Sequence, residues 1–208
     1  MNFIIAVDGP AASGKGTVAS VLARHYGFPY LDTGLLYRAV GVASAGNLSE
    51  AAKLAARLDP ASLDNPAYRT RQAGELASQV AASPEVRDAL LDFQRRFAAN
   101  PAGAVLDGRD IGTVIAPGAQ AKLFVTASTG VRAERRWLQL LNQGERVTKE
   151  AVFADIVARD NRDSHRSAAP LVRAKDAALL DTSEMTIDHA FREALRLVEL
   201  ARSAPQGR

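Results

Sequence analysis

The chain has 208 residues, of which 47% are hydrophobic and 24% charged, a balance typical of a globular protein with a core of its own. Its net charge is only +3, and no basic stripe interleaved with aromatics stands out, so nucleic-acid binding is not predicted. We expect a soluble, cytoplasmic protein without a signal peptide, because there is no cysteine and no apolar run near the roughly 20 residues that span a bilayer.

The first predicted strand leads directly into a glycine-rich segment. Residues 3–7 are apolar and partly β-branched, as in a buried parallel strand, and residues 18–23 have the composition of a helix. In this context glycines let successive backbone N–H groups converge on phosphate oxygens, and the helix N-terminus adds further donors. The predicted phosphate-binding loop consists of Gly9, Pro10, Ala11, Ala12, Ser13, Gly14, Lys15, Gly16 and Thr17.

Two side chains of this loop have predicted roles. Lys15 is positioned to reach the β- and γ-phosphates of a nucleotide, and a hydroxyl just beyond it to hold Mg²⁺. That hydroxyl belongs to Thr17, because Gly16 occupies the position directly after the lysine. The alternative interpretation is a glycine-rich turn that follows a strand by chance.

Between residues 29 and 100 the patterns predict one short strand and then helices. Thr33 is positioned as the N-cap of the first helix, and Ser83, followed by Pro84 and Glu85, as the N-cap of the last. The strand covers 29–32, and the helices cover 35–40, about 49–58, 68–82 and 84 to about 98.

After residue 100, strands and helices alternate. Helices are expected to begin after Ser128, at Thr148 and after Thr186, and residues 142–144 break the first of them. The second ends at about residue 165 and the third at about residue 202. The strands cover 103–107, 122–126 and 178–181.

This alternation predicts an α/β fold with a parallel sheet, right-handed crossovers and helices on both faces. Ligands of such sheets collect beyond the carboxyl ends of the strands, where Asp8, Asp32 and Asp107 lie. Three interpretations of Asp8 stay open: it orients Lys15, it holds a water on Mg²⁺, or it makes a structural hydrogen bond to the loop backbone.

Arginines gather in the predicted helices between residues 128 and 166. Arg132, Arg135 and Arg136 are spaced i, i+3 and i+4, so they share one helix face. A closing lid that delivers guanidinium groups excludes water from a transferring phosphoryl group. The alternative is that these are solvated charges on an exposed helix.

A second stripe lies on the next helix, where Arg159, Asp163 and Arg166 are spaced i, i+4 and i+7. Its position at the far edge of the predicted lid favours contact with a ligand, and the alternative is a ladder of intrahelical ion pairs that includes Asp155. The arginines favour a kinase over a GTPase, a motor or a nucleotide sensor, because phosphoryl transfer needs two phosphate groups held in line with their charge neutralised.

Several segments are specific in combination. They are the loop in the form Gly-x4-Gly-Lys-Gly-Thr, Leu31-Asp32-Thr33-Gly34 with Tyr37-Arg38, Ala77-Ser78-Gln79-Val80-Ala81, Pro84-x-Val86-Arg87, Asp107-Gly108-Arg109-Asp110-Ile111-Gly112-Thr113, and Arg159-Asp160-x-Arg162-Asp163-x-x-Arg166 followed by Ala169-Pro170-Leu171. Together they resemble the bacterial cytidylate kinases over about residues 3–198.

The resemblance implies a three-layer P-loop fold with a five-stranded parallel sheet, an acceptor-binding helical insertion and a small helical lid. It also implies transfer of a phosphoryl group from ATP to CMP or dCMP with Mg²⁺, and we expect a monomer that binds these small molecules. The implied regions are a core at 1–45, 101–128 and 167–208, an acceptor-binding region at 46–100 and a lid at about 129–166.

Residue roles follow from the same resemblance. Arg38 and Arg109 resemble the residues that bind the acceptor phosphate, whereas Ser78, Arg87 and Asp110 resemble those that read the base. Further expected contacts of the acceptor are Thr33, Arg159, Asp163 and Arg166, and the expected catalytic cations are Lys15, Arg132, Arg136 and Arg159.

The chemistry of the base supports this set independently. Cytosine presents an amine donor beside the N3 and O2 acceptors, which a carboxylate and an arginine complement, whereas uracil would leave Asp110 facing a carbonyl. As alternatives, Asp110 pairs with Arg109 or caps the following helix, and Ser78 is an ordinary helix residue.

One segment departs from the family. Residues 46–66 are too short and too poor in β-branched residues to form the small antiparallel insert that many members carry. The rival functions are a kinase for another small acceptor such as UMP or AMP, and a regulator that binds nucleotide without catalysis. His25, His165 and His189 lack metal-ligand spacing, and Trp137 is expected to pack against its neighbours.

Overall fold

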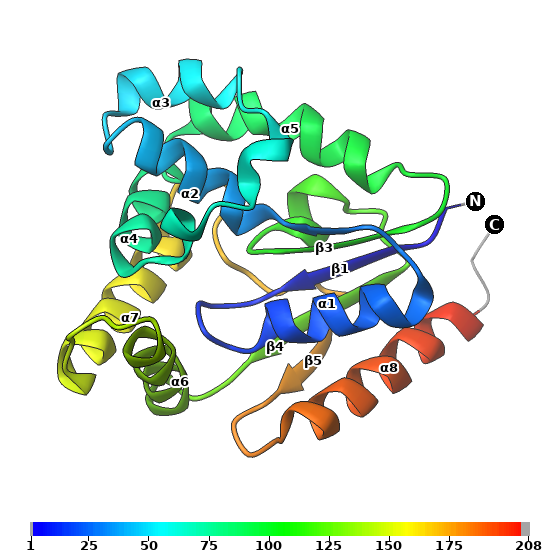
Figure 1. Cartoon of the computed structure of the whole chain (residues 1–208). Helices are drawn as coiled ribbons and strands as arrows, with labels where there is room; N and C mark the ends of the chain where they lie inside the picture. The colour runs from blue at the N-terminus through cyan, green and yellow to red at the C-terminus, as the bar shows by residue number, and fades with distance from the viewer. Residues whose placement is uncertain (1, 205–208) are drawn as a thin grey trace. The chain divides into compact units, whose positions relative to one another are not determined.

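The computed structural model describes residues 2–204 and contains a five-stranded sheet in the order β2-β3-β1-β4-β5 (Figure 1). Central β1 pairs in parallel with β3 on one side and β4 on the other, and Val7 lies opposite both Asp107 and Leu123. The predicted parallel α/β sheet is confirmed. The strands are β1 (Ile4–Asp8), β2 (Tyr30–Asp32), β3 (Ala104–Gly108), β4 (Ala121–Thr126) and β5 (Ala178–Asp181).

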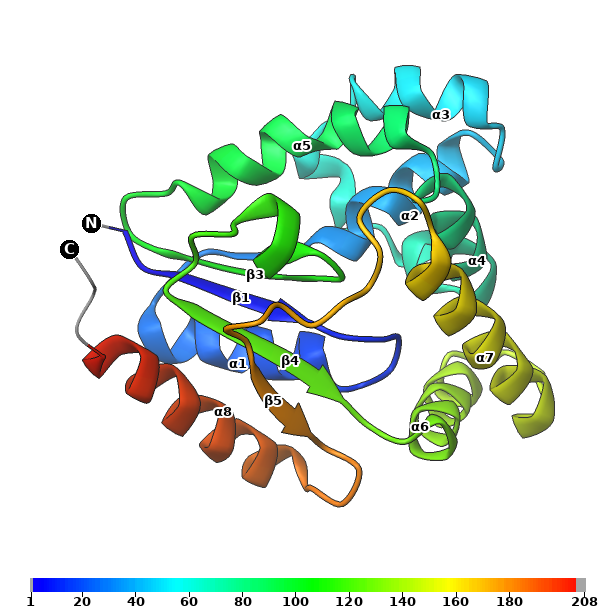
Figure 2. The same ribbon diagram turned by 180° about the vertical axis from the view of Figure 1, so that it is seen from behind.

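The chain forms two compact units, and the sheet belongs mainly to the first, whose described residues are 2–31, 95–128 and 171–204. Helices α1 (Lys15–Tyr26) and α8 (Ile187–Ser203) pack together on the face of the sheet turned toward the viewer in Figure 1. The short π-helix η3 (Ile111–Ile115) lies on the opposite face, seen in Figure 2.

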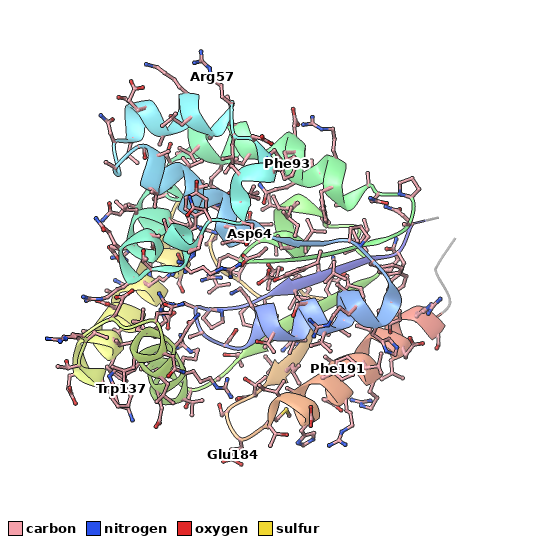
Figure 3. The ribbon with its side chains drawn as sticks, viewed as in Figure 1. Arg57, Asp64, Phe93, Trp137, Glu184 and Phe191 are labelled. Atoms are coloured by element: carbon pink, nitrogen blue, oxygen red, sulfur yellow. The ribbon has the colours of Figure 1, made fainter. Side chains whose placement is uncertain are left out.

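The core of this unit explains the apolar first strand. Ile5 and Val7 of β1 are fully buried, together with Leu22 of α1 and Ala194 of α8. Phe191, labelled in Figure 3, packs on the edge of this cluster from α8. Burial on both faces is what a central parallel strand requires, and it fixes the point at which β1 ends and the glycine-rich loop begins.

The second unit comprises residues 32–94 and 129–170 and is helical. Helix α2 packs closely on α4, and α6 runs along α7. Helix α5 begins in this unit and continues into the first unit at Arg95. The helices that lie wholly or partly in the second unit are α2 (Thr33–Ala43), α3 (Leu48–Ala55), the 3-10 helices η1 (Pro60–Leu63) and η2 (Pro66–Arg69), α4 (Arg71–Val80), α5 (Pro84–Ala98), α6 (Thr129–Asn142) and α7 (Lys149–His165).

Several helix boundaries follow the predicted caps. The Thr148 and Thr186 hydroxyls accept hydrogen bonds from Ala151 N and His189 N, at 3.2 Å each. The prediction for Thr33 was wrong, because the N-cap of α2 is Asp32, which is still extended, and Thr33 is already the first helical residue.

The predicted helix over 68–82 was wrong in its first part. Thr70 is extended, and its hydroxyl accepts from Ala73 N at 3.1 Å, so the 3-10 helix η2 ends there and α4 starts afresh. A helix after Asp110 was considered only as an alternative role for that residue, and the π form of η3 was not predicted. Residues 46–66 contain helices and no strand, in agreement with the expected loss of the β-insert.

Within residues 2–204, no helix combines the length and the apolar character needed to cross a membrane. The division into two units does not test the three predicted regions, which stay a prediction.

Candidate active site

The glycine-rich loop joins the end of β1 to the start of α1, as predicted. Gly9, Ala12 and Gly14 have φ values of 153°, 59° and 88°. Backbone with left-handed residues of this kind turns successive N–H groups toward a common point, and Gly14 is also the N-cap of α1. The loop therefore has the conformation of an anion-binding turn at a helix N-terminus.

Gly9 is required by its surroundings. A Cβ atom at this position would lie 1.9 Å from the carbonyl oxygen of Val125 in β4. At the other end of the loop, the buried Thr182 hydroxyl bonds to Ser13 O at 2.8 Å and Thr126 O at 3.1 Å. Thr182 follows β5 directly, so the loop is anchored to two strand ends. Sequence reasoning did not find this anchor.

Lys15, the first residue of α1, lies beside a buried carboxylate. Its Nζ atom is 3.8 Å from Oδ2 of Asp107, and Oδ1 of Asp107 accepts from the Tyr30 hydroxyl at 2.9 Å. Asp107 is 2% exposed. Asp107, the residue before the last of β3, therefore contacts Lys15, whereas both Asp8 oxygens bond to η3. Thr17 follows in the first turn of α1 and is exposed, which leaves its hard oxygen donor accessible.

Asp8, at the end of β1, binds the backbone of η3 and does not orient Lys15. Its two carboxylate oxygens accept from Ile111 N and Gly112 N of η3, each at 2.7 Å. Burial raises the pKa of Asp8 to about 6 from the usual 3.8, although both N–H donors act to lower it. The structural interpretation was wrong about the partner, because the N–H groups that Asp8 accepts from belong to η3 and not to the phosphate loop.

Arg109 and Asp110 occupy the link between β3 and η3 that Asp8 holds. Asp110 is 5% exposed and takes the position before the first residue of η3, without a side-chain cap hydrogen bond there. Arg109 is half-buried, and its Nη1 donates to Gly108 O at 3.2 Å. Two predicted acceptor-binding side chains are therefore presented by a segment whose backbone is fixed by a carboxylate.

In the second unit, α2 supplies Arg38 and the buried Thr33. Arg38 Nη1 donates to Tyr68 O at 2.8 Å and to Thr70 O at 3.3 Å, the segment that precedes α4. Arg87 on α5 is 7% exposed, and its guanidinium lies 5.5 Å from the centre of the Tyr37 ring. Both arginines are thus held by neighbours in the folded chain.

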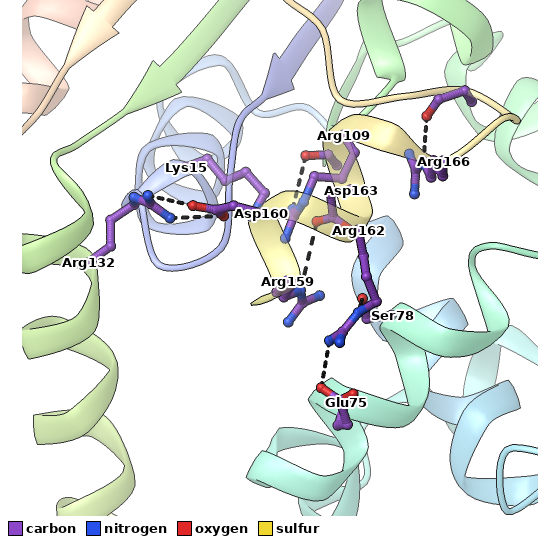
Figure 4. Close-up of polar contacts among 12 residues, drawn as sticks. Lys15, Glu75, Ser78, Arg109, Arg132, Arg159, Asp160, Arg162, Asp163 and Arg166 are labelled. Carbon is purple, nitrogen blue, oxygen red and sulfur yellow. Dashed lines mark hydrogen bonds and ion pairs between the residues drawn. The ribbon is translucent and has the colours of Figure 1, made fainter. Parts of the chain in front are cut away.

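Helix α7 brings two arginines against α4 (Figure 4). The first of them is Arg159, which meets Arg38 of α2 at Gly74. A Cβ atom on Gly74 would lie 3.4 Å from Arg38 Nη2 and 3.6 Å from Arg159 Nη1, so the Arg38 and Arg159 guanidinium groups approach the same turn of α4. One turn later, Arg162 donates from Nε to Ser78 Oγ at 3.2 Å and from Nη2 to Glu75 Oε2 at 2.7 Å. The sequence motif contains Arg162, but no role was predicted for it.

The predicted lid arginines on α6 have defined partners. Arg132 donates to both oxygens of Asp160 on α7 and to Thr129 Oγ1. Arg136 donates to Gln139 Oε1 at 2.8 Å and to Thr70 O at 3.3 Å. The interpretation as purely solvated charge fails for Arg132, which is 4% exposed.

The stripe on α7 is partly an ion-pair ladder. Arg159 Nε lies 3.8 Å from Oδ2 of the buried Asp163, and Arg166 Nε donates to Ala169 O at 2.6 Å. Asp155 is not part of the ladder, because Arg71 on α4 binds it at 2.6 and 3.0 Å. Arg166 is the C-cap of α7 and has extended backbone, so the stripe ends just beyond the helix.

Within residues 2–204, no group of three or more His, Cys, Asp or Glu side chains is arranged to hold a metal ion. Trp137 is half-buried and donates from Nε1 to Val147 O at 3.0 Å, as expected for a residue that packs within the α6–α7 hairpin.

Comparison with known proteins gives consistent matches along the whole chain. The cytidylate kinase family profile matches residues 5–200. Proteins named cytidylate kinase from Caulobacter sp. (strain K31) and Xanthobacter autotrophicus (strain Py2) are each 62% identical, over 98% and 96% of this chain and 97% and 99% of theirs.

Among solved structures, the chain resembles a gluconokinase from Sinorhizobium meliloti with a TM-score of 0.53 and 18% identity, over 96% of this chain and 94% of that one. An uncharacterized protein from Eubacterium ventriosum gives a TM-score of 0.57 at 14% identity, over 98% of this chain and all of that one. At these identities the structural matches speak for the fold alone.

Proposed function

The chain belongs to the cytidylate kinase family, and from this premise we propose how its residues divide the work of the reaction. The enzyme transfers the γ-phosphoryl group of ATP to CMP or dCMP and releases ADP with CDP or dCDP. An acceptor phosphate oxygen forms the new bond to the γ-phosphorus, and the bond to the β,γ-bridging oxygen breaks. Because the chain belongs to this family, the rival functions, a kinase for UMP or AMP and a regulator without catalysis, are set aside.

The donor is held by the loop between β1 and α1. Its backbone N–H groups, the N-terminus of α1 and Lys15 neutralise the β- and γ-phosphates. Asp107, 3.8 Å from Lys15 Nζ, keeps the lysine at the loop before nucleotide arrives. The observation that carries this half of the proposal is the left-handed loop conformation directly before Lys15.

Mg²⁺ is proposed as the cofactor, with Thr17 as its protein ligand. The fit rests on the exposed hydroxyl in the first turn of α1, a hard oxygen donor of the type that Mg²⁺ prefers. When bound, the ion supplies charge neutralisation on the phosphate oxygens. Hydroxyl ligation leaves most of its coordination to phosphate and water, as is usual for Mg²⁺.

Arg38 and Arg109 are proposed to bind the acceptor phosphate, and Ser78, Arg87 and Asp110 to read cytosine. The Arg38 and Arg159 guanidinium groups both approach Gly74, and two cations near one helix turn support binding of an anionic group such as the acceptor phosphate there. Thr33, Asp163 and Arg166 complete the proposed acceptor set.

Lid arginines are proposed to neutralise the transferring phosphoryl group. Arg132, Arg136 and Arg159 would act during turnover on the same phosphoryl group as Lys15, since in-line transfer needs charge compensation on both sides. Closure also excludes water, which would otherwise accept the phosphoryl group. We further propose a monomer, because one chain supplies every residue in this scheme. A cytoplasmic location is proposed because it is typical of the family.

The test is an ADP-release assay with ATP and each of CMP, dCMP, UMP and AMP, with and without Mg²⁺. We expect fast release with CMP and dCMP, slow release with UMP and AMP, and loss of turnover when Mg²⁺ is removed by a chelator. Equal release with UMP would contradict the proposed base-reading set, and turnover that survives the chelator would contradict the metal.

A further inference from the structure

Arg162 connects α7 to α4 through two side chains. Its Nε donates to Ser78 Oγ at 3.2 Å, and its Nη2 donates to Glu75 Oε2 at 2.7 Å (Figure 4). The Arg162 and Glu75 side chains are 37% and 45% exposed, whereas Ser78 is 5% exposed. An exposed ion pair of this kind contributes little to stability, so its geometry calls for another explanation.

The bond to Ser78 determines what the serine can offer a ligand. A hydroxyl has one hydrogen and two lone pairs, and Arg162 can only donate, so Ser78 accepts in this bond. Within residues 2–204 the Ser78 hydroxyl hydrogen has no acceptor of its own. Arg162 therefore leaves Ser78 with a hydrogen to donate, in a buried place where an unused donor is costly.

We propose that Arg162 is a positioning residue that makes Ser78 a hydrogen-bond donor to the base and thereby favours cytosine over uracil. The inference rests on the proposed base-reading role of Ser78. In this arrangement Ser78 donates to cytosine N3, which has one lone pair, and Arg87 donates to O2. Uracil N3 has a hydrogen in place of the lone pair and opposes the serine. Glu75 completes the arrangement, because its carboxylate fixes one end of the guanidinium and so aims Nε at Ser78.

Lysine cannot reproduce this arrangement. Its ammonium is a point charge without the planar fork that lets one arginine serve two partners at fixed angles. Arg162→Lys therefore keeps the charge next to Glu75 while it removes the directed Nε–H bond to Ser78. This substitution separates orientation of the hydroxyl from the simple presence of a cation.

The test compares kcat/KM for CMP with kcat/KM for UMP in wild type, Ser78→Ala, Arg162→Lys and the double variant. We expect Ser78→Ala and Arg162→Lys each to lower the CMP-over-UMP ratio about tenfold, the effect of one directed hydrogen bond. The double variant should match Ser78→Ala alone, because both changes remove the same interaction. Glu75→Gln should lower the ratio about threefold, and it provides a second variant if Arg162→Lys folds poorly by circular dichroism.

Arg71→Lys is the matched control. Arg71 also joins α4 to α7, through bonds of 2.6 and 3.0 Å to Asp155, but it does not contact Ser78. The CMP-over-UMP ratio of kcat/KM values in Arg71→Lys should stay at the wild-type value. An equal fall of the ratio in Arg71→Lys and Arg162→Lys would mean that helix packing is responsible, and would overturn the inference.

Two further outcomes separate the inference from the function on which it rests. If Ser78→Ala lowers the ratio but Arg162→Lys and Glu75→Gln do not, Ser78 reads the base without help and the inference alone fails. If Ser78→Ala leaves the ratio unchanged, the base-reading role of Ser78 fails, and the role of Arg162 fails with it.

Discussion

Arg132 and Asp160 form a two-bond ion pair that joins α6 to α7. Nη1 donates to Oδ1 at 3.1 Å and Nη2 to Oδ2 at 2.7 Å, and the Arg132 side chain is 5% exposed (Figure 4). A buried guanidinium needs such a partner, since an unpaired charge at this depth costs several kcal/mol. The same pair holds a proposed catalytic cation in one orientation.

Arg132→Lys should therefore lower kcat at least about tenfold, because lysine cannot make both bonds. The melting temperature should also fall. Lys149→Ala is the control, since its ion pair with Glu134 also joins α6 to α7 but both side chains are about half exposed. That variant should change the free energy of unfolding by less than about 1 kcal/mol. Full turnover in Arg132→Lys would remove Arg132 from the proposed set.

Lys15→Ala should reduce kcat by about a hundredfold or more and leave the affinity for CMP near the wild-type value. The lysine acts on the donor phosphates, and a preorganised charge of this kind is worth several kcal/mol in the transition state. ADP release measures kcat, and calorimetric titration with CMP measures affinity. A variant with wild-type turnover would exclude the loop from the reaction.

Asp110→Ala should relax the preference for CMP over UMP by about tenfold or more. The buried carboxylate complements the amine of cytosine, and uracil presents a carbonyl in its place. The ratio of kcat/KM values for the two acceptors is the measurement. Asp92→Ala, an exposed position on α5, should leave the ratio unchanged. If both variants keep the wild-type ratio, Asp110 does not read the base.

Gly41→Ala should destabilise the protein by about 2 to 3 kcal/mol, because the added methyl must push α2 away from α4. A Cβ atom on Gly41 would lie 2.8 Å from the carbonyl carbon of Leu76 and 3.0 Å from Ala77 N. Gly130→Ala on α6, where nothing lies within 4 Å, should be neutral or slightly stabilising. Urea unfolding of both variants checks the difference, and equal stabilities would contradict the close packing.

Asp8 should make stability depend on pH. Its folded-state pKa of about 6 lies above the usual 3.8, so the folded protein binds this proton more tightly than the unfolded chain. The resulting stabilisation is full below pH 3.8 and is lost as the pH rises through about 6. The free energy of unfolding of wild type minus that of Asp8→Asn should fall by about 2 kcal/mol from pH 4 to pH 7. A difference that stays flat or rises would show that burial does not raise this pKa.

Local chemistry explains why much of the fold was predictable. The apolar first strand, the loop that ends at Lys15 and the threonine caps at 148 and 186 each depend on neighbours a few residues away. The boundary at Thr33 was harder, because an aspartate and a threonine in succession are both suitable caps. Nothing local marks the π form of η3, whose two leading N–H groups bind Asp8, more than 100 residues earlier in the chain.

The site shows the same limit. Residue types identified the candidate arginines and the Arg159–Asp163 pair within α7, but not Asp160, the carboxylate on another helix that holds Arg132. Arg162 and Ser78 are separated by 84 residues, and their contact depends on how α7 packs on α4. Asp107 lies beside Lys15 because β3 is next to β1 in the sheet. The patterns that identify strands do not specify the order of strands in the sheet, so this contact could not be predicted. Thr182 had one available signal, a hydroxyl directly after a predicted strand.

The anchor that Thr182 provides has a consequence for synthesis on the ribosome. The loop leaves the exit tunnel early, but the hydroxyl that bonds to Ser13 O follows 169 residues later. The loop thus receives its last anchor near the end of translation, when β5 joins the sheet. A nascent chain without that strand holds the Ser13 end of the loop with one hydrogen bond fewer than the finished protein.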